Sequence, residues 1–395
     1  YYVAAAADDD DDDDDNKGLP LLVINGGPGA AHNYNLPLRP LACGGGGAAG
    51  HSAVIYYDQG GNGQSKIPPD ANLERDYPFV LDIDYLGGEE LQAVIDATIL
   101  SEDKDAKFHL VSDSFGTMIA LQYVLNYHEN KDRNKHIESL VLNGPIPNTR
   151  EFTENAWNPK TGTVGAMPGY FLERYKAIVE KQDFEDNPEF QSMEQTLGTI
   201  FTFRSQIPGD CFMDALLGGN HEIYEKIWGV SEFVPMDGTL KPFDVYAALE
   251  DFCGDNGGGN LLQLPPTLLT YGEFDEIREE SILKLNDLWQ KAGGYAKYHM
   301  FVGSGHATIG DATAELISKT GDFLKRVESG MISVEDGHHP SDGEYPNNDE
   351  PNAGRWIFVV EILVGFLIGN LSGYLIARRS AHQRHHQYEQ VNDVA

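Results

Sequence analysis

Short apolar segments that alternate with helix-like stretches constrain the fold of this chain most strongly. The segments are rich in Val, Ile and Leu, and glycine or polar turn residues follow them, at 19–25, 53–57, 107–112, 137–143, 266–271 and 298–302. A helical pattern at 117–126 directly follows the third segment. Strands that alternate with helices form a mostly parallel sheet that is covered on both faces. The sequence therefore predicts a large α/β domain.

Between 149 and 263 the alternation gives way to a mostly helical stretch with many aromatic residues. We expect this stretch to be an insertion that covers the carboxyl ends of the strands as a cap. The α/β core then consists of two parts, 1–148 and 264–328. The first part contains a run of aspartates in an acidic segment, 8–16, which is expected to be a solvated loop.

The charge balance excludes one class of partner. The chain has 28 Lys and Arg against 62 Asp and Glu, and its formal net charge is -34. Because such an acidic surface repels phosphate backbones, no nucleic-acid partner is expected. The three cysteines, Cys43, Cys211 and Cys253, are too few for a disulfide scaffold, and a Cys211–Cys253 bridge is left open.

An apolar run near the end of the chain predicts one transmembrane helix at 356–377. Only Glu361, Asn370 and Ser372 interrupt it. As a helix it would be roughly 33 Å long, which matches a bilayer core of about 30 Å. The Gly-, Pro- and Asp-rich segment 329–355 is expected to be a flexible stalk.

The flanks and one face of this helix suggest an orientation and a partner. Arg378 and Arg379 open a short basic tail, 378–395, so the positive-inside rule places that tail in the cytosol and the folded domain outside the cell or in a lumen. A tail-anchored protein that faces the cytosol is the alternative. Gly365, Gly369 and Gly373 recur every fourth residue, which favours a homodimer through close helix packing.

The pentapeptide Ser112-Asp113-Ser114-Phe115-Gly116 joins an expected strand to an expected helix. A serine on such a tight turn stands exposed at the top of the sheet, and the amide of the next residue points toward the reaction centre. We therefore predict that Ser114 is a nucleophile and that the Phe115 amide is an oxyanion donor. Ser112 occupies a position where glycine is usual.

A glycine-rich turn, Asn25-Gly26-Gly27-Pro28-Gly29, follows the first expected strand. Glycines at this place let backbone amides approach a substrate oxygen. These amides would supply the second half of an oxyanion hole. Gly26 is a further candidate for contact with the substrate.

Two more candidates follow later strands. Asp275 and His306 lie in the turns GEFD and GSGH, and the chain order Ser, Asp, His is that of α/β-hydrolases. In this arrangement His306 takes the proton from Ser114 and returns it to the leaving amine, while Asp275 fixes the imidazole tautomer. Glu273 and Glu276 are rival acids, but only Asp275 stands at the expected turn position.

Together the segments NGGPG, YYDQGGNGQS, SDSFG, GEFD and GSGH resemble the proline iminopeptidase family of serine peptidases. The resemblance covers about residues 1–327. It implies an α/β-hydrolase fold with a helical cap and release of an N-terminal residue, often proline, from short peptides with a free N-terminus. It also implies that Gly27 and Phe115 supply the oxyanion amides, and that no metal or cofactor is needed.

The resemblance further implies that cap carboxylates hold the substrate's free ammonium group, which fixes the cleavage register. Glu232 is the first candidate and Glu194 the second. Residues 1–7 resemble the strand that precedes the oxyanion strand, so the first strand of the family fold is expected to be missing. Asn25 and Gly60 depart from the family pattern, which usually has His at the first position and Arg or a bulky residue at the second.

Two other functions also fit these residues. The first is an esterase or amidase that uses the same triad without recognising an ammonium group. The second is a non-catalytic ectodomain that keeps the fold as a binding surface.

Overall fold

The computed structural model describes residues 2–5, 18–43, 51–126, 135–205, 210–253 and 264–332. The strands are β1 (Tyr2–Ala5), β2 (Leu21–Ile24), β3 (Ala53–Tyr56), β4 (Phe108–Asp113), β5 (Ile137–Asn143), β6 (Thr267–Gly272) and β7 (Ala296–Phe301). The core helices are η2 (His32–Cys43), α1 (Leu73–Asp76), η4 (Pro78–Leu81), α2 (Ile83–Tyr85), η5 (Leu86–Glu90), α3 (Leu91–Thr98), α4 (Phe115–Asn126), α12 (Glu279–Lys291), α13 (Thr308–Asp311) and α14 (Thr313–Glu328).

These strands form one sheet in the order β1-β3-β2-β4-β5-β6-β7. All neighbouring strands are parallel except the edge strand β1, which pairs antiparallel with β3. The predicted mostly parallel α/β sheet is therefore confirmed. The parallel order brings the carboxyl ends of β2, β4, β5, β6 and β7 to one edge of the sheet, where loops from distant parts of the chain meet.

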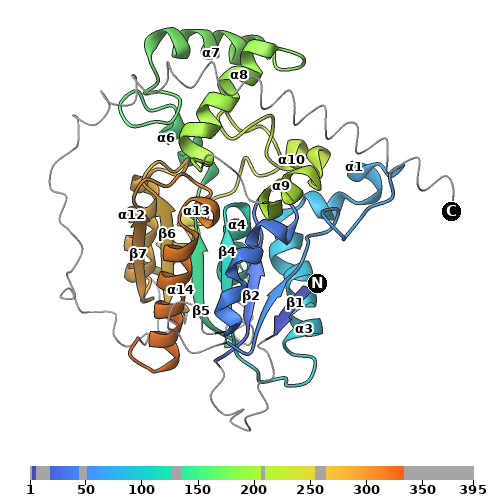
Figure 1. Cartoon of the computed structure of the whole chain (residues 1–395), viewed down its shortest axis with the longest axis vertical. Helices are drawn as coiled ribbons and strands as arrows, with labels where there is room; N and C mark the ends of the chain where they lie inside the picture. Colours follow the sequence, from blue (N-terminus) through green and yellow to red (C-terminus); the bar gives the residue numbers. More distant parts are fainter. Residues whose placement is uncertain are drawn as a thin grey trace. The chain divides into compact units, whose positions relative to one another are not determined.

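Both faces of the sheet are covered, as β2 illustrates. Leu22 and Ile24 belong to an apolar cluster with α3, α4 and α12, whereas Leu21 and Val23 belong to another cluster with η2 and α14. The alternation arises because successive side chains of a strand point to opposite faces. Figure 1 shows α4 behind the sheet and α14 in front of it.

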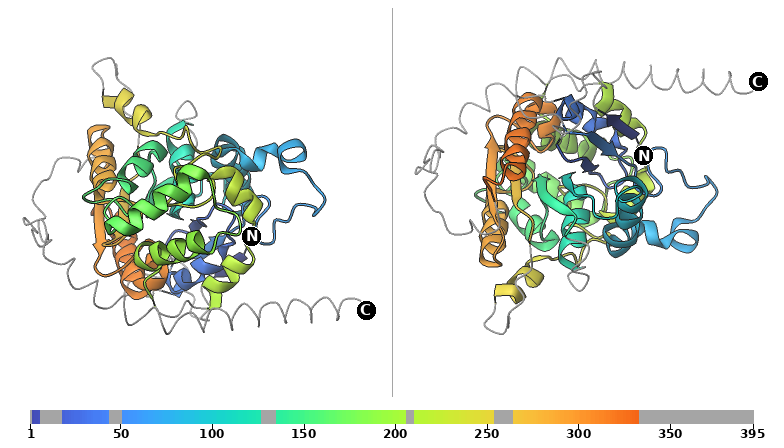
Figure 2. Two further views of the ribbon diagram at one scale, coloured as in Figure 1. Left: turned by 90° about the horizontal axis from the view of Figure 1, so that it is seen from above. Right: turned by 90° about the horizontal axis from the view of Figure 1, so that it is seen from below.

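The segment between β5 and β6 forms a helical cap. Its helices are α6 (Thr149–Ala156), α7 (Gly169–Lys181), α8 (Pro188–Leu197), η6 (Gly198–Thr202), α9 (Asp210–Leu217), α10 (His221–Ile227) and α11 (Tyr246–Cys253). Aromatic residues such as Phe171, Tyr175 and Phe190 give the cap a small apolar core of its own. The view from above places α7 and α8 across the end of the sheet, as the first view does (Figures 1 and 2).

Several predictions fall outside the described residues: the Asp run, the predicted stalk from 333 onward, the apolar run at 356–377 and the basic tail. The stalk was predicted to begin at 329, but Ile332 is buried in the same apolar cluster as η2 and α14, so the packed domain extends to 332. None of the helices within the described ranges is both long enough and apolar enough to cross a bilayer. The Cys211 side chain is a free thiol in this structure.

A partly buried carboxyl, that of Glu90, lies beside Gly60. Both Glu90 side-chain oxygens face the Gly60 amide, and the closer one accepts its hydrogen bond at 3.1 Å. Burial raises the pKa of Glu90 to about 7, and this single hydrogen bond only partly offsets the burial. Because only a backbone donor faces this carboxyl, burial disfavours the ionised form of Glu90.

This arrangement predicts a pH-dependent effect of Glu90→Gln on stability. A carboxyl with a raised folded-state pKa stabilises the fold below its unfolded pKa, and that contribution is lost as the pH rises through about 7. The substitution should therefore raise the free energy of unfolding by about 1–2 kcal/mol at pH 8.5 and by much less at pH 5. Urea unfolding at both pH values measures this. The exposed neighbour Glu89 provides the control Glu89→Gln, and an equal gain at both pH values would contradict the prediction.

Candidate active site

Ser114 lies on a sharp turn between β4 and α4. Its φ is 51°, in the left-handed region, and its amide donates to the Asn143 carbonyl at 2.8 Å. Neighbouring glycines permit this packing: a Cβ on Gly116 would lie 2.5 Å from the Ile24 carbonyl oxygen, and one on Gly26 would lie 2.7 Å from Ser114 Cβ. The strand-turn-helix geometry expected of a nucleophile elbow is thus present at Ser114.

The serine at position 112 fits the elbow without distorting it. Ser112 is fully buried, and its hydroxyl donates to the Val141 carbonyl on β5 at 3.3 Å. A hydroxyl with an acceptor carries little of the penalty of an unpaired buried polar group. Serine therefore replaces glycine here at a tolerable energetic cost.

The glycine turn after β2 approaches Ser114 from the side. Gly27 has a φ of 122°, which a side chain would rarely adopt, and the Asn25 side chain holds the turn by donating to the Ala30 carbonyl at 2.8 Å. The Gly26 amide donates to the Tyr34 hydroxyl, so it offers no donor to a substrate. Neither the Gly27 nor the Phe115 amide has a protein acceptor among the described residues.

His306 and Asp275 are in direct contact. The His306 Nδ1 and Asp275 Oδ1 atoms are 2.7 Å apart, and both residues are buried. The Asp275 carboxylate also accepts the amides of Gly272 at 2.9 Å and Ile277 at 3.0 Å, which fix its orientation. With Nδ1 bonded to a carboxylate, the imidazole presents Nε2 for proton exchange.

Gly144 brings the histidine next to the elbow. It follows Asn143, whose carbonyl accepts the Ser114 amide, and a Cβ on Gly144 would lie 2.5 Å from His306 Cε1. The imidazole therefore stands directly against the loop after β5 that also supports Ser114. The structure gathers Ser114, Asp275 and His306 at one edge of the sheet.

The cap is bonded to both sides of this site. The amides of His306 and Ala307 donate to the Phe201 and Thr202 carbonyls of η6, each at 2.7 Å. On the other side the Asn220 amide, just before α10, donates to the Gly29 carbonyl at 2.7 Å. The cap thus contacts the histidine loop and the glycine turn directly.

Three carboxyl groups lie between the cap and the triad. The charges of Glu232, Glu276 and Glu194 all contribute to raising the pKa of the buried Tyr224 hydroxyl, behind burial itself, which shows that they gather around one side chain. Glu194 also accepts a hydrogen bond from the Tyr175 hydroxyl, and Glu276 accepts one from Thr202. An acidic cluster of this kind suits a cationic group.

Burial keeps this acidic cluster from ionising fully. It raises the pKa of Glu194 to about 7 and that of Glu276 to about 8, and the Glu232 charge adds to both shifts. Burial alone would lower the pKa of His306, but the charges of Asp275, Glu276 and Asp113 outweigh it and raise that pKa to about 10. These neighbouring carboxylates therefore stabilise the protonated form of His306.

The three candidate acids, Asp275, Glu273 and Glu276, have different hydrogen-bond partners in the structure. Asp275 meets His306, whereas Glu273 accepts the Gly303 amide at 2.9 Å and Glu276 turns toward Thr202. Sequence reasoning treated Glu276 only as a rival to Asp275 and missed its place in the acidic cluster. The available signal was its position directly after Asp275, at the edge of the sheet that the cap covers.

A group of possible metal ligands lies elsewhere. The side chains of His51, His109 and Glu328 converge, with His109 Nε2 3.0 Å from Glu328 Oε1. His109 is near the start of β4, whereas Ser114 follows the end of that strand, so this group lies away from the triad.

Comparisons with known proteins agree with this geometry. Residues 20–313 match the family described as alpha/beta hydrolase fold. A proline iminopeptidase of Heyndrickxia coagulans is 27% identical over 311 residues, which are 78% of this chain and 92% of that protein. A proline iminopeptidase of Thermoplasma volcanium is 25% identical over 265 residues, which are 67% of this chain and 76% of that protein.

Solved structures also resemble this one. The crystal structure of proline iminopeptidase from Mycobacterium smegmatis has a TM-score of 0.63 at 22% identity and covers 84% of this chain and 95% of its own. The crystal structure of VinJ has the same TM-score at 18% identity, with 82% and 94% covered. At these identities the likeness shows the fold alone.

The contact at Gly144 predicts the effect of Gly144→Ala. The new methyl group would displace the His306 imidazole, and a displacement of about 1 Å can reduce turnover about 100-fold. The rate at which a fluorophosphonate probe labels Ser114 measures this effect. Gly330→Ala is the matched control, because Gly330 also has a positive φ, 69°, but has open space around it. Equal labelling rates in the two variants would contradict the proximity argument.

Proposed function

This chain belongs to the α/β-hydrolase fold family, and from that premise we propose that it is a serine aminopeptidase that releases an N-terminal residue, preferentially proline, from short peptides. Three observations support this proposal. They are the sharp turn at Ser114, the contact between His306 and Asp275, and the similarity to proline iminopeptidases at 27% and 25% identity.

The reaction would proceed through an acyl-enzyme. His306 Nε2 takes the proton from the Ser114 hydroxyl as Oγ attacks the scissile carbonyl carbon, and it then protonates the leaving amine. The Gly27 and Phe115 amides are free to stabilise the oxyanion. Water then attacks the acyl-enzyme, with the same histidine as the base, and releases the free amino acid. No metal or cofactor enters these steps.

The acidic cluster is the observation that carries the choice of an aminopeptidase. Glu276 is buried, and Glu194 and Glu232 are partly buried, between the triad and the cap. Burial and mutual repulsion disfavour these carboxyls as anions, so a cation beside them would stabilise the ionised forms, and the α-ammonium of a peptide would supply it. Binding this ammonium at a fixed place would allow only one residue to lie between it and Ser114.

The same cation would activate the base. The carboxylates that raise the pKa of His306 would be neutralised in part by the bound ammonium. The imidazole would then lose its proton more readily and accept the one from Ser114. A substrate without the ammonium would leave His306 mostly protonated, so an N-blocked peptide should react slowly even when it binds.

This function predicts a selective effect of Glu276→Gln. Loss of one carboxylate should lower kcat/KM for prolyl p-nitroanilide about 10- to 100-fold, which corresponds to one charged hydrogen bond. Hydrolysis of the uncharged ester p-nitrophenyl acetate should not fall, because that substrate has no ammonium. Ser114→Ala should abolish both activities.

The exposed cap glutamate Glu185 provides a matched control, and Glu185→Gln should leave both activities unchanged. Comparison of prolyl p-nitroanilide with its N-acetylated form tests the assignment itself. Equal turnover of the two by the wild type would refute an aminopeptidase and favour the esterase or amidase alternative. Failure of the probe to label Ser114 in folded protein would favour a binding ectodomain.

We also propose that the run at 356–377 tethers this enzyme to a membrane, with the catalytic domain outside the cell or in a lumen. The support is the composition of the run and the arginines that follow it. The glycines at 365, 369 and 373 would let two such helices pair.

The tether predicts that the full chain stays in the membrane pellet after alkaline carbonate extraction, whereas a chain that ends at 338 is released. Paired changes in the middle of the run, Leu367→Arg with Ile368→Arg, should also release the full chain, because each arginine opposes insertion by about 2.5–3.5 kcal/mol. Release of the unaltered full chain would contradict the tether. Protease accessibility in sealed vesicles reports the orientation.

A further inference from the structure

A buried hydrogen-bond chain connects the three loops of the active site. It begins at the Gly26 amide in the glycine turn, which donates to the hydroxyl of Tyr34 on η2. The Tyr34 hydroxyl donates to Asp113 Oδ2 at 2.7 Å. Asp113 is the last residue of β4 and directly precedes Ser114, so the chain links the glycine turn to the elbow.

The hydrogen-bond chain continues from the other oxygen of the Asp113 carboxylate. The Asn143 side-chain amide, at the end of β5, donates to Asp113 Oδ1. The Asn143 side-chain oxygen accepts two hydroxyls, from Thr270 at 2.8 Å and from Thr308 at 2.7 Å. Thr308 follows His306 by two residues, and its amide donates to the His306 carbonyl at 2.8 Å.

The groups at the two ends of this hydrogen-bond chain determine which atom donates and which accepts in each bond. A backbone N–H can only donate, so the Tyr34 oxygen accepts from Gly26 and its proton must go to Asp113. The two threonine hydroxyls occupy the Asn143 oxygen, so its NH₂ group must face Asp113. Both oxygens of Asp113 therefore face donors. Burial raises the pKa of this carboxyl above its ordinary value, and the hydrogen bonds from Tyr34 and Asn143 oppose that shift and favour the ionised carboxylate.

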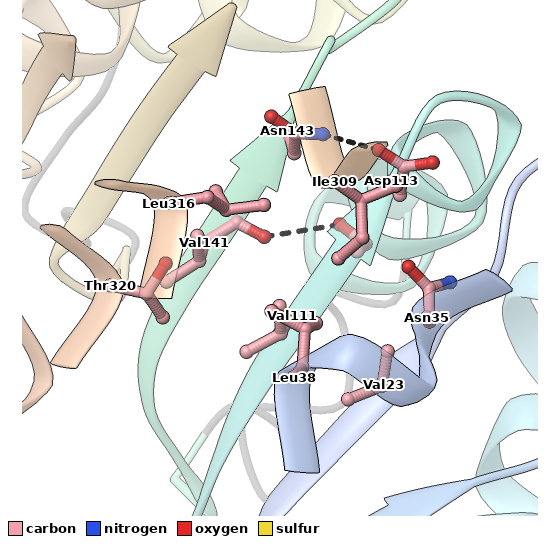
Figure 3. A pocket seen from close by; sticks show the side chains of 11 residues that line it. Val23, Asn35, Leu38, Val111, Asp113, Val141, Asn143, Ile309, Leu316 and Thr320 are labelled. Carbon is pink, nitrogen blue, oxygen red and sulfur yellow. Dashed lines mark hydrogen bonds between the residues drawn. The ribbon is translucent and has the colours of Figure 1, made fainter. Parts of the chain in front are cut away.

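The surroundings bury this hydrogen-bond chain. Asp113 and Asn143 are buried, and Figure 3 shows their side chains pointing toward one another beside a cavity of about 10 Å³. Such a space admits at most about one water molecule. In a buried site each of these bonds is stronger than in water, and a missing partner is costly.

We propose that Tyr34 and Asp113 are positioning residues for catalysis at Ser114, and that they hold the glycine turn, the elbow and the histidine loop at fixed distances from one another. Gly27, which follows Gly26, then presents its amide to the oxyanion, and Thr308 keeps His306 in place. The inference rests on the proposed catalysis at Ser114 but not on the identity of the substrate.

Asp113 has a second effect through its charge. His306 is surrounded by Asp275 and Glu276 from the loop after β6 and by Asp113 from β4, and each of these charges raises its pKa. Loss of the Asp113 charge should therefore lower the pKa of His306. A purely structural role would not move this value.

The first test is Tyr34→Phe, assayed with p-nitrophenyl acetate so that ammonium recognition plays no part. The substitution removes the acceptor of Gly26 and one donor to Asp113, and kcat should fall about 10- to 100-fold with KM unchanged within about twofold. The control is Tyr56→Phe. Tyr56 is buried in the same apolar cluster, and its hydroxyl has no partner among the described residues.

The second test is Asp113→Asn, which keeps the side-chain volume. The acid limb of its pH–rate profile for kcat/KM should move to lower pH, since the imidazole loses one neighbouring negative charge. Thermal unfolding and probe titration of Ser114 give the folded and active fractions of each variant. If Asp113→Asn does not fold, Tyr34→Phe still decides the question.

Two results would overturn the inference. The first is a kcat of Tyr34→Phe within twofold of the wild-type value. The second is a fall in kcat that is fully explained by a smaller fraction of active Tyr34→Phe protein. An unmoved acid limb in folded Asp113→Asn would overturn the effect of its charge. Failure of the proposed function itself appears differently, as a wild type that neither hydrolyses the ester nor reacts with the probe.

Discussion

The close packing of the turn between β4 and α4 against β2 is the constraint on which the site depends. Ser114 has a left-handed backbone, which costs a residue with a side chain about 1–2 kcal/mol. The surrounding structure holds it there: Asn143 accepts its amide, and Gly116 lies against the Ile24 carbonyl with no space for a side chain. The strained turn lifts the hydroxyl out of the sheet while α4 remains buried. The other loops of the site take their positions from this turn.

The second determinant is the negative field at the edge of the sheet. Four carboxyls, Asp113, Asp275, Glu276 and Glu232, lie near the imidazole or near one another. Asp275 and Asp113 are satisfied by hydrogen bonds from within the fold. Glu276 has Thr202 as its hydrogen-bond donor, and its raised pKa shows that this bond does not compensate for burial. The site therefore places carboxyls whose burial is not fully compensated close to Ser114.

Most of the fold was accessible from sequence because it depends on periodicity. The strand predicted at 137–143 coincides with β5, and the insertion predicted to begin at 149 coincides with the start of α6. The strand predicted at 298–302 was displaced, since β7 spans Ala296–Phe301 and has only one well-buried face. An edge strand that is partly exposed gives a weaker apolar signal than a central one.

The parts of the site that could not be predicted depend on the direction of side chains. The chain order and turn positions of Ser114, Asp275 and His306 can be read from the sequence, because each follows a strand. Nothing in the sequence indicates that Tyr34, on a helix far from the elbow along the chain, donates to Asp113, or that Glu276 turns toward the cap. Such contacts depend on how η2 packs against the sheet and on how η6 of the cap contacts the loop that carries His306. Periodicity does not determine that packing.

The departures from the family pattern differ in how the fold accommodates them. Asn25 is bonded on both sides, since it donates to Gln59 at 3.0 Å and its carbonyl accepts from Gln59 at 2.9 Å. Ser112 donates to Val141. The Ser112 hydroxyl thus has a partner, whereas the Asn25 side-chain oxygen is buried without one among the described residues. Gly60 leaves the partly buried Glu90 carboxyl with only a backbone donor. Two of the three replacements therefore leave a polar group incompletely satisfied, one in the glycine turn of the site and one beside it, and each such group costs free energy of folding.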